Sequence, residues 1–111
     1  MKMEGNLKIT SFNCNGFKAR NYDYITKVFN NCDILLLQET WLHNFEHNNF
    51  SKILPRCQFS AVSAMDETDV QRVGRPYGGV AILWNKALKL SFNPISTISK
   101  RLCAINVKCN K

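Results

Sequence analysis

The sequence predicts an α/β protein built on one mixed β-sheet, with one clear helix and no second sheet. Its 111 residues are enough for one domain, because single-core domains usually hold about 100 to 150 residues. Residues 34–37 and 80–84 are apolar throughout, as is typical of strands buried on both faces. Convincing helical spacing occurs only in residues 21–30, so one face of the sheet has no cover within the chain.

The uncovered face has two explanations, and both stay open. The protein could dimerise through it, or residues 1–111 could form the first part of a larger two-sheet domain. The chain stops directly after a strand-like segment, without a closing element, and this favours a partial domain.

The first half of the chain alternates strand and helix signals. Residues 7–12 alternate apolar and polar side chains, which predicts a strand, and turn-forming residues follow at 13–16. Asn21 is a good N-cap residue, and apolar residues then recur at helical spacing until residue 30. The apolar segment 34–37 is too short for a helix and predicts a buried strand.

The second half predicts strands and loops only. Residues 41–55 are Asn-rich and predict an irregular segment, and residues 58–64 predict a weaker strand. Three acidic side chains and two arginines in residues 66–75 predict a solvated loop. The remaining predicted strands are residues 80–84, 88–92 and 101–107.

The charge balance favours an anionic partner. Fifteen Lys and Arg residues against eight Asp and Glu give a net charge of +7, which attracts polyanions such as DNA. The basic residues are spread along the chain, so a merely solvated basic surface is the alternative. The chain has no apolar run near the roughly 20 residues of a membrane span and no signal peptide, so we expect an intracellular protein without a membrane partner.

Cysteine and histidine patterns predict no metal or disulfide framework. The five cysteines include no Cys-x-x-Cys pair, and we expect reduced, mostly buried thiols. His43 and His47 have metal-ligand spacing for a helix, but the surrounding asparagines favour a polar loop.

Polar side chains that could take part in binding or catalysis occur where predicted strands end. Asn13 follows the first strand and Glu39 follows the second, and strand ends are where sites are usually built. A glutamate supplies the hard, charged oxygen that Mg²⁺ prefers. Three segments carry the pattern, in this order: LKITSFNCNG at 7–16, DILLLQETWL at 33–42 and RPYGGVAILW at 75–84.

Together these segments resemble the endonuclease/exonuclease/phosphatase superfamily, most of all the endonuclease domains of non-LTR retrotransposons. The resemblance implies a DNase I-like fold, a four-layer α/β sandwich of two packed sheets. Residues 1–111 would then be the N-terminal part of such a domain, with its second sheet missing.

The resemblance also implies roles for four residues. Glu39 matches the family's Mg²⁺-binding glutamate, with Mn²⁺ as a possible substitute, and Asn13 matches the asparagine that supports the metal and phosphate site. Asn15 stands where many relatives have an aspartate, so a substrate contact there would not depend on charge. Tyr77 matches a position that lies near the substrate strand in some members.

Structural interpretations of the same residues remain open. Asn13 could form an Asx turn, and Glu39 could be a surface carboxylate at the end of a strand. Residues 78–79 could be glycines only because the backbone needs a tight approach or positive φ there. The aromatic side chains Tyr77, Trp41 and Trp84 could serve only in packing.

Two segments of the family pattern are absent. The family's later Asp-x-Asn and Ser-Asp-His segments supply the base and further ligands, and the sequence contains neither. One carboxylate cannot both bind the metal and activate water. We therefore expect this chain to be inactive alone.

The function that the resemblance implies is that of the N-terminal fragment of a Mg²⁺-dependent DNA endonuclease, which nicks the target DNA of a retrotransposon. As part of a retrotransposon polyprotein it would be located in the nucleus. The alternatives are a noncatalytic basic nucleic-acid-binding module, a fragment of a superfamily phosphatase and a nonfunctional remnant.

Overall fold

The computed structural model describes residues 6–65 and 76–109, so the predicted loop at 66–75 lies outside the described residues. No helix among these residues has the length and apolar character needed to cross a membrane. In chain order the elements are β1 (Ile9–Asn13), α1 (Ala19–Asn30), β2 (Ile34–Gln38), the 3₁₀ helix η1 (Asn44–Glu46), α2 (Asn49–Ile53), β3 (Cys57–Val62), β4 (Val80–Asn85), β5 (Leu90–Ile95) and β6 (Ala104–Cys109).

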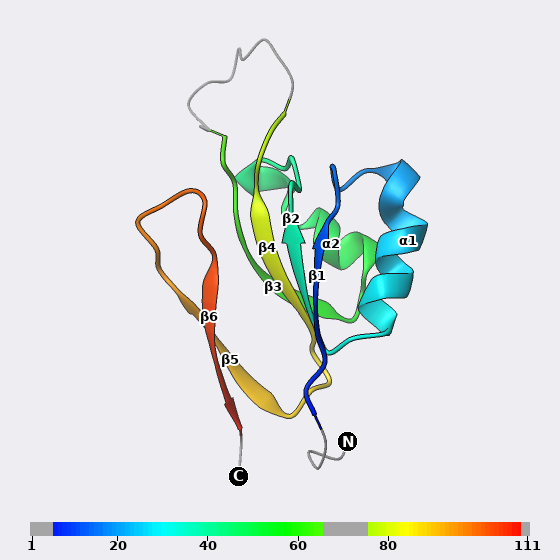
Figure 1. Cartoon of the computed structure of the whole chain (residues 1–111), viewed down its shortest axis with the longest axis vertical. Coiled ribbons are helices and arrows are strands. Elements are labelled where there is room, and N and C mark those ends of the chain that lie inside the picture. The colour runs from blue at the N-terminus through cyan, green and yellow to red at the C-terminus, as the bar shows by residue number, and fades with distance from the viewer. Residues whose placement is uncertain (1–5, 66–75, 110–111) are drawn as a thin grey trace.

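The main sheet is mixed and has four strands in the order β1, β2, β4, β3 (Figure 1). β1 and β2 are parallel, whereas β4 is antiparallel to both of its neighbours. The two all-apolar segments are the central strands β2 and β4, as predicted. The register aligns Asn13 with Gln38 and Gln38 with Val80, so β1 and β2 end where β4 begins.

One face of the main sheet packs against helix α1. Its residues Ile25 and Phe29 are buried in the larger of two apolar cores. The helix predicted at residues 21–30 is confirmed, but α1 begins at Ala19 and Asn21 is therefore not its N-cap.

The same core contains a second helix that the sequence did not predict. Residues 41–55 were expected to be irregular, and this was wrong, because η1 and α2 lie there. Phe50 of α2 is fully buried, with its ring 4.7 Å from that of Phe17 and 5.3 Å from that of Phe59. One helical turn is too short to show a period, so packing rather than propensity stabilises it.

The expectation of a missing second sheet was also wrong. β5 and β6 form a separate two-stranded antiparallel sheet on the face opposite the helices (Figure 1). The rings of Trp84 and Phe92 stack between the two sheets, with centroids 4.6 Å apart and planes at 8°. Around them is a second apolar core formed by Ile34, Ile82, Leu36, Leu88, Cys103 and Ile105. The alternation of apolar and polar residues predicts that a segment is a strand, but it does not show which sheet the strand joins.

The second sheet covers only part of the opposite face. The side chains of β2 and β4 on that face are largely buried, but Ile9 of β1 is 55% exposed. The described residues thus form a mixed α/β structure, which is consistent with part of the DNase I-like fold that the resemblance implies and is not a full sandwich.

Candidate functional site

Backbone hydrogen bonds join the loops that follow β1 and β2. The Gly16 N–H donates to the Glu39 carbonyl at 2.7 Å, and the Phe17 N–H donates to the Thr40 carbonyl at 2.9 Å. The parallel pairing of the two strands therefore continues past their ends, and the two loops hold each other in place.

The loop before β4 joins the same network. The Thr40 N–H donates to the Gly79 carbonyl at 3.2 Å, and the Trp41 N–H donates to the Gly78 carbonyl at 2.8 Å. A Cβ on residue 79 would collide with the Thr40 hydroxyl, and Gly79 has a φ of +96°. Glycine is required here both for its conformation and for the close approach. The three segments singled out in the sequence therefore meet at one end of the main sheet.

Unusual backbone conformations concentrate in these loops. Among the described residues, positive φ in non-glycine residues occurs at Asn15 (49°), Glu39 (57°) and Trp41 (60°). Each such residue costs on the order of 1–3 kcal/mol, and such outliers cluster at functional sites. Thr40, between two of them, is fully buried and anchors the loop through both its N–H and its carbonyl.

The carboxylate of Glu39 is oriented by its own loop. It is partly buried, and the indole N–H of Trp41 donates to its Oε1 at 2.9 Å. The Nζ of Lys18 lies 4.7 Å from the centre of the Trp41 ring.

Asn13 and Asn15 lie beside Glu39 on the neighbouring loop, and both are exposed. The Oδ1 of Asn13 accepts a hydrogen bond from the Asn15 N–H at 3.1 Å, which is the Asx turn considered as an alternative. The turn holds the Asn13 amide at the end of β1, next to Gln38 in the register.

A hollow of about 710 Å³ opens at this end of the sheet and contains Glu39 and Tyr77. Two cations from the turn before β6, Lys100 and Arg101, also line it. Tyr77 is 43% exposed. The remaining lining residues are Gln38, Ala64, Gly78, Gly79 and Val80. Two of the four predicted site residues thus share one hollow, and Asn13 and Asn15 are not among its lining residues.

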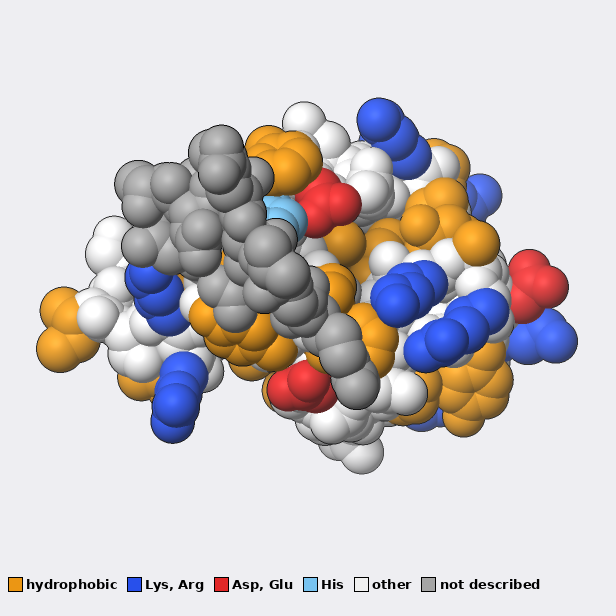
Figure 2. Space-filling view, turned by 90° about the horizontal axis from the view of Figure 1, so that it is seen from above, with side chains coloured by type: hydrophobic (Ala, Val, Ile, Leu, Met, Phe, Trp, Pro, Cys, Tyr) orange, Lys and Arg blue, Asp and Glu red, His pale blue; other side chains and the backbone are white. Residues whose placement is uncertain are grey.

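Sequence reasoning had assigned no site role to Lys100 and Arg101. Adjacent basic residues before a strand are common, and nothing local connects them with Glu39. Figure 2 looks onto this end of the molecule, where Lys and Arg side chains are visible on the left and on the right of the view.

Among the described residues that line the hollow, Glu39 is the one carboxylate that could bind a metal ion. They contain no group of three His, Cys, Asp or Glu side chains placed to hold a metal ion. Mg²⁺ does not need one, because it keeps several waters and takes one or two carboxylates together with substrate phosphate oxygens. A partly buried Glu39 with Lys100 and Arg101 in the same hollow fits that mode of binding.

The histidines flank η1 and pack against aromatic rings. The ring of His43 stacks on Phe45 with centroids 5.2 Å apart, and the ring of His47 stacks on Phe50 at 5.9 Å. His47 is buried, so the expectation of a polar loop was wrong for this residue.

All five cysteines are free, but only Cys14 and Cys57 are fully buried, fewer than expected. Burial raises the pKa of each of these two thiols to about 11. The Cys14 thiol donates to the Glu39 carbonyl at 3.3 Å, so it supports the loop as a neutral donor.

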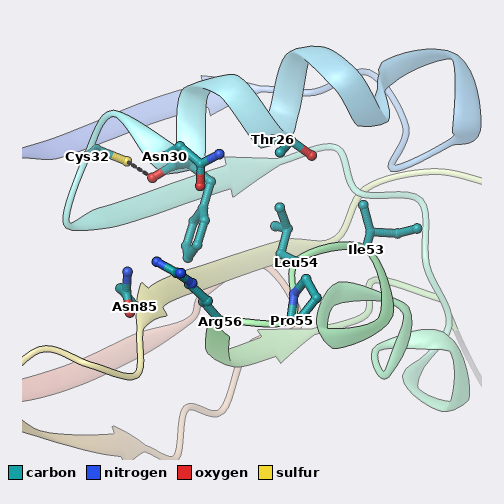
Figure 3. Close-up of a pocket in the computed structure, with 9 residues that line it drawn as sticks. Thr26, Asn30, Cys32, Ile53, Leu54, Pro55, Arg56 and Asn85 are labelled. Carbon is teal, nitrogen blue, oxygen red and sulfur yellow. Dashed lines mark hydrogen bonds between the residues drawn. The ribbon is translucent and has the colours of Figure 1, made fainter.

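A second hollow, of about 530 Å³, lies at the opposite end of the sheet (Figure 3). Asn30 lies on the side of helix α1, and Arg56 and Asn85 lie on the opposite side of the hollow. It is lined by Thr26, Phe29, Asn30, Cys32, Ile53, Leu54, Pro55, Arg56 and Asn85. None of these is a carboxylate or a predicted site residue, so this hollow is not the candidate site.

Comparison with known protein families identifies the family to which this sequence is similar. The sequence profile of the endonuclease/exonuclease/phosphatase family matches residues 10–104, from β1 to the first residue of β6. No curated protein matches the chain.

Proposed function

The chain belongs to the endonuclease/exonuclease/phosphatase family, and from this premise we propose that it forms the metal- and phosphate-binding part of a Mg²⁺-dependent DNA endonuclease. The observation that carries the proposal is the shared hollow, which joins the oriented carboxylate of Glu39 to Lys100 and Arg101. A carboxylate and two cations suit a divalent metal and the phosphodiester that it contacts.

Each residue has a distinct role in this proposal. Glu39 would hold Mg²⁺ or Mn²⁺, and a bound metal supplies a Lewis acid at the phosphoryl oxygen. Lys100 and Arg101 would bind backbone phosphates, and Tyr77, which lines the same hollow, would contact the substrate strand. Asn13 and Asn15 present amide groups from the loop after β1.

Water activation is the part of the reaction that these residues do not explain. Lys100 and Arg101 are cations, and Glu39 is committed to the metal. We therefore include in the proposal that the base comes from residues of a longer protein, such as a retrotransposon polyprotein, and that the chain alone does not cleave DNA.

The test is metal binding followed by strand cleavage. Electron paramagnetic resonance of free Mn²⁺ should show that the purified chain binds Mn²⁺ in the presence of a phosphorothioate oligonucleotide. Glu39→Gln should weaken Mn²⁺ binding at least tenfold, because a neutral amide replaces the charged ligand. Asp23→Asn, which removes an exposed carboxylate of α1, is the matched control and should leave it unchanged.

Two outcomes would contradict the proposal. Equal Mn²⁺ affinity in the wild type and in Glu39→Gln would show that Glu39 is not a metal ligand. Mg²⁺-dependent nicking of a supercoiled plasmid by the isolated chain would show that no residue from elsewhere is needed.

A second candidate, favoured by the net charge of +7, is a noncatalytic module that binds nucleic acid. This candidate predicts that DNA binding needs no divalent metal and that Glu39→Gln changes neither DNA nor Mn²⁺ binding. A phosphatase of the same family would instead release phosphate from a phosphomonoester when the longer protein is assayed.

A further inference from the structure

The side chain of Trp41 is built into the surroundings of the Glu39 carboxylate. Its indole Nε1–H donates to Glu39 Oε1 at 2.9 Å, so Trp41 contributes a polar contact as well as its ring. We infer that Trp41 is a positioning residue, which orients Glu39 so that the carboxylate binds the metal through its other oxygen. The inference rests on the proposed function, because it requires Glu39 to be a metal ligand.

The backbone on both sides of the bond is fixed. Glu39 and Trp41 both have left-handed φ values, 57° and 60°, and Thr40 between them is fully buried. The Trp41 N–H is bonded to the Gly78 carbonyl at 2.8 Å, and the Glu39 carbonyl accepts from the Gly16 N–H at 2.7 Å. The strained turn therefore brings the two side chains together and prevents them from drifting apart.

The indole ring of Trp41 packs between residues of the loop after β1. A Cβ on residue 16 would approach Cε3 of Trp41 to 2.5 Å, so a glycine at this position leaves the space that the ring occupies. The Nζ of Lys18 lies 4.7 Å from the ring centre, a cation–π contact. These contacts restrain the ring in the orientation that directs its N–H at Glu39.

The consequence is a preorganised metal ligand. A hydrogen bond from N–H to a carboxylate is stronger than a neutral one, and it leaves the second oxygen to the metal. Partners that orient a metal ligand in this way usually contribute 10- to 100-fold to metal affinity. Trp41 itself touches neither metal nor substrate in this arrangement.

The test measures Mn²⁺ affinity in three variants of the full chain. Trp41→Phe keeps an aromatic ring but loses the N–H, and it should weaken Mn²⁺ binding about tenfold. Trp84→Phe alters the chain's other tryptophan but keeps an aromatic ring against Phe92 in the second core, so the β5–β6 sheet stays docked and the affinity should be unchanged. Glu39→Gln reports on the proposed function in the same assay.

A second measurement uses tryptophan fluorescence and retains Trp41, so it remains informative even if the Trp41→Phe variant fails to fold. In Trp84→Phe, Trp41 is the sole tryptophan, and paramagnetic Mn²⁺ should quench its emission with the dissociation constant found for binding. Emission that does not respond to bound Mn²⁺, or an unchanged affinity in Trp41→Phe, would overturn the role of Trp41 while leaving Glu39 as a ligand. Mn²⁺ binding that is insensitive to Glu39→Gln would overturn the proposed function, and this inference with it.

Discussion

The amide side chain of Asn21 stabilises the loop that leads from β1 into α1. Its Nδ2 donates to the Cys14 carbonyl at 3.0 Å and to the Gly16 carbonyl at 2.7 Å. A buried carbonyl without a partner would cost on the order of 1–3 kcal/mol, so one side chain stabilises two backbone groups of the site loop. N-capping was expected of Asn21, and the side chain instead reaches back from the first turn of α1.

Asn21→Ala should therefore lower the free energy of unfolding by about 1–3 kcal/mol, because both carbonyls lose their donor. Urea denaturation measures the change. Asn31→Ala is the control, since its amide makes one exposed bond, to the Lys27 carbonyl, and should cost about 0.5 kcal/mol. Equal losses in the two variants would contradict this role of Asn21.

Docking of the β5–β6 sheet positions the cations of the candidate site. Lys100 and Arg101 lie in the connection between β5 and β6, and that sheet rests on the main sheet through the stack of Trp84 and Phe92. The Cys103 thiol adds a bond to the Ser60 carbonyl of β3 at 3.1 Å. Packing between the two sheets thus places the cations in the lining of the hollow that contains Glu39.

Phe92→Ala should loosen the β5–β6 sheet. Removing the ring leaves a cavity against Trp84, and we expect a loss of about 2–4 kcal/mol of stability. Hydrogen exchange should accelerate in β5 and β6, and Trp84 emission should shift to longer wavelength. Phe45→Ala is the control, because Phe45 is 75% exposed. Unchanged protection of β6 in Phe92→Ala would show that other contacts dock this sheet.

Positive charge is distributed over the whole molecule, but the proposed function assigns it unequal roles. Lys100 and Arg101 line the hollow with Glu39, whereas Lys27 lies in the last turn of α1, near the opposite hollow. Contacts to phosphates release counterions, so each lost contact should be visible in the salt dependence of DNA binding.

Lys100→Ala and Arg101→Ala should each weaken DNA binding and lower the slope of log affinity against log salt by about 1. Fluorescence anisotropy of a labelled oligonucleotide over a range of salt concentrations measures both. Lys27→Ala should leave the slope unchanged. If all three variants lowered the DNA affinity and the salt slope equally, DNA binding would depend on the overall charge of the protein and not on this hollow.

Local patterns were sufficient for several parts of this fold. Apolar runs identified β2 and β4 as doubly buried strands, and apolar spacing identified most of α1. Turn-forming residues and a carboxylate next to strand ends marked the three loops that meet at one end of the sheet. These features follow from the side-chain period of an element and the chemistry at its ends, which neighbouring residues carry.

The second sheet, helix α2 and the presence of Lys100 and Arg101 in the same hollow as Glu39 emerged only from the folded chain. α2 is a single turn that exists because Phe50 is buried among distant rings. β5 and β6 look locally like any other alternating strands, and their separate sheet depends on how they pack on β4. Contacts between residues far apart in the chain decide such features, because the free energy that stabilises them comes from the burial of both partners together.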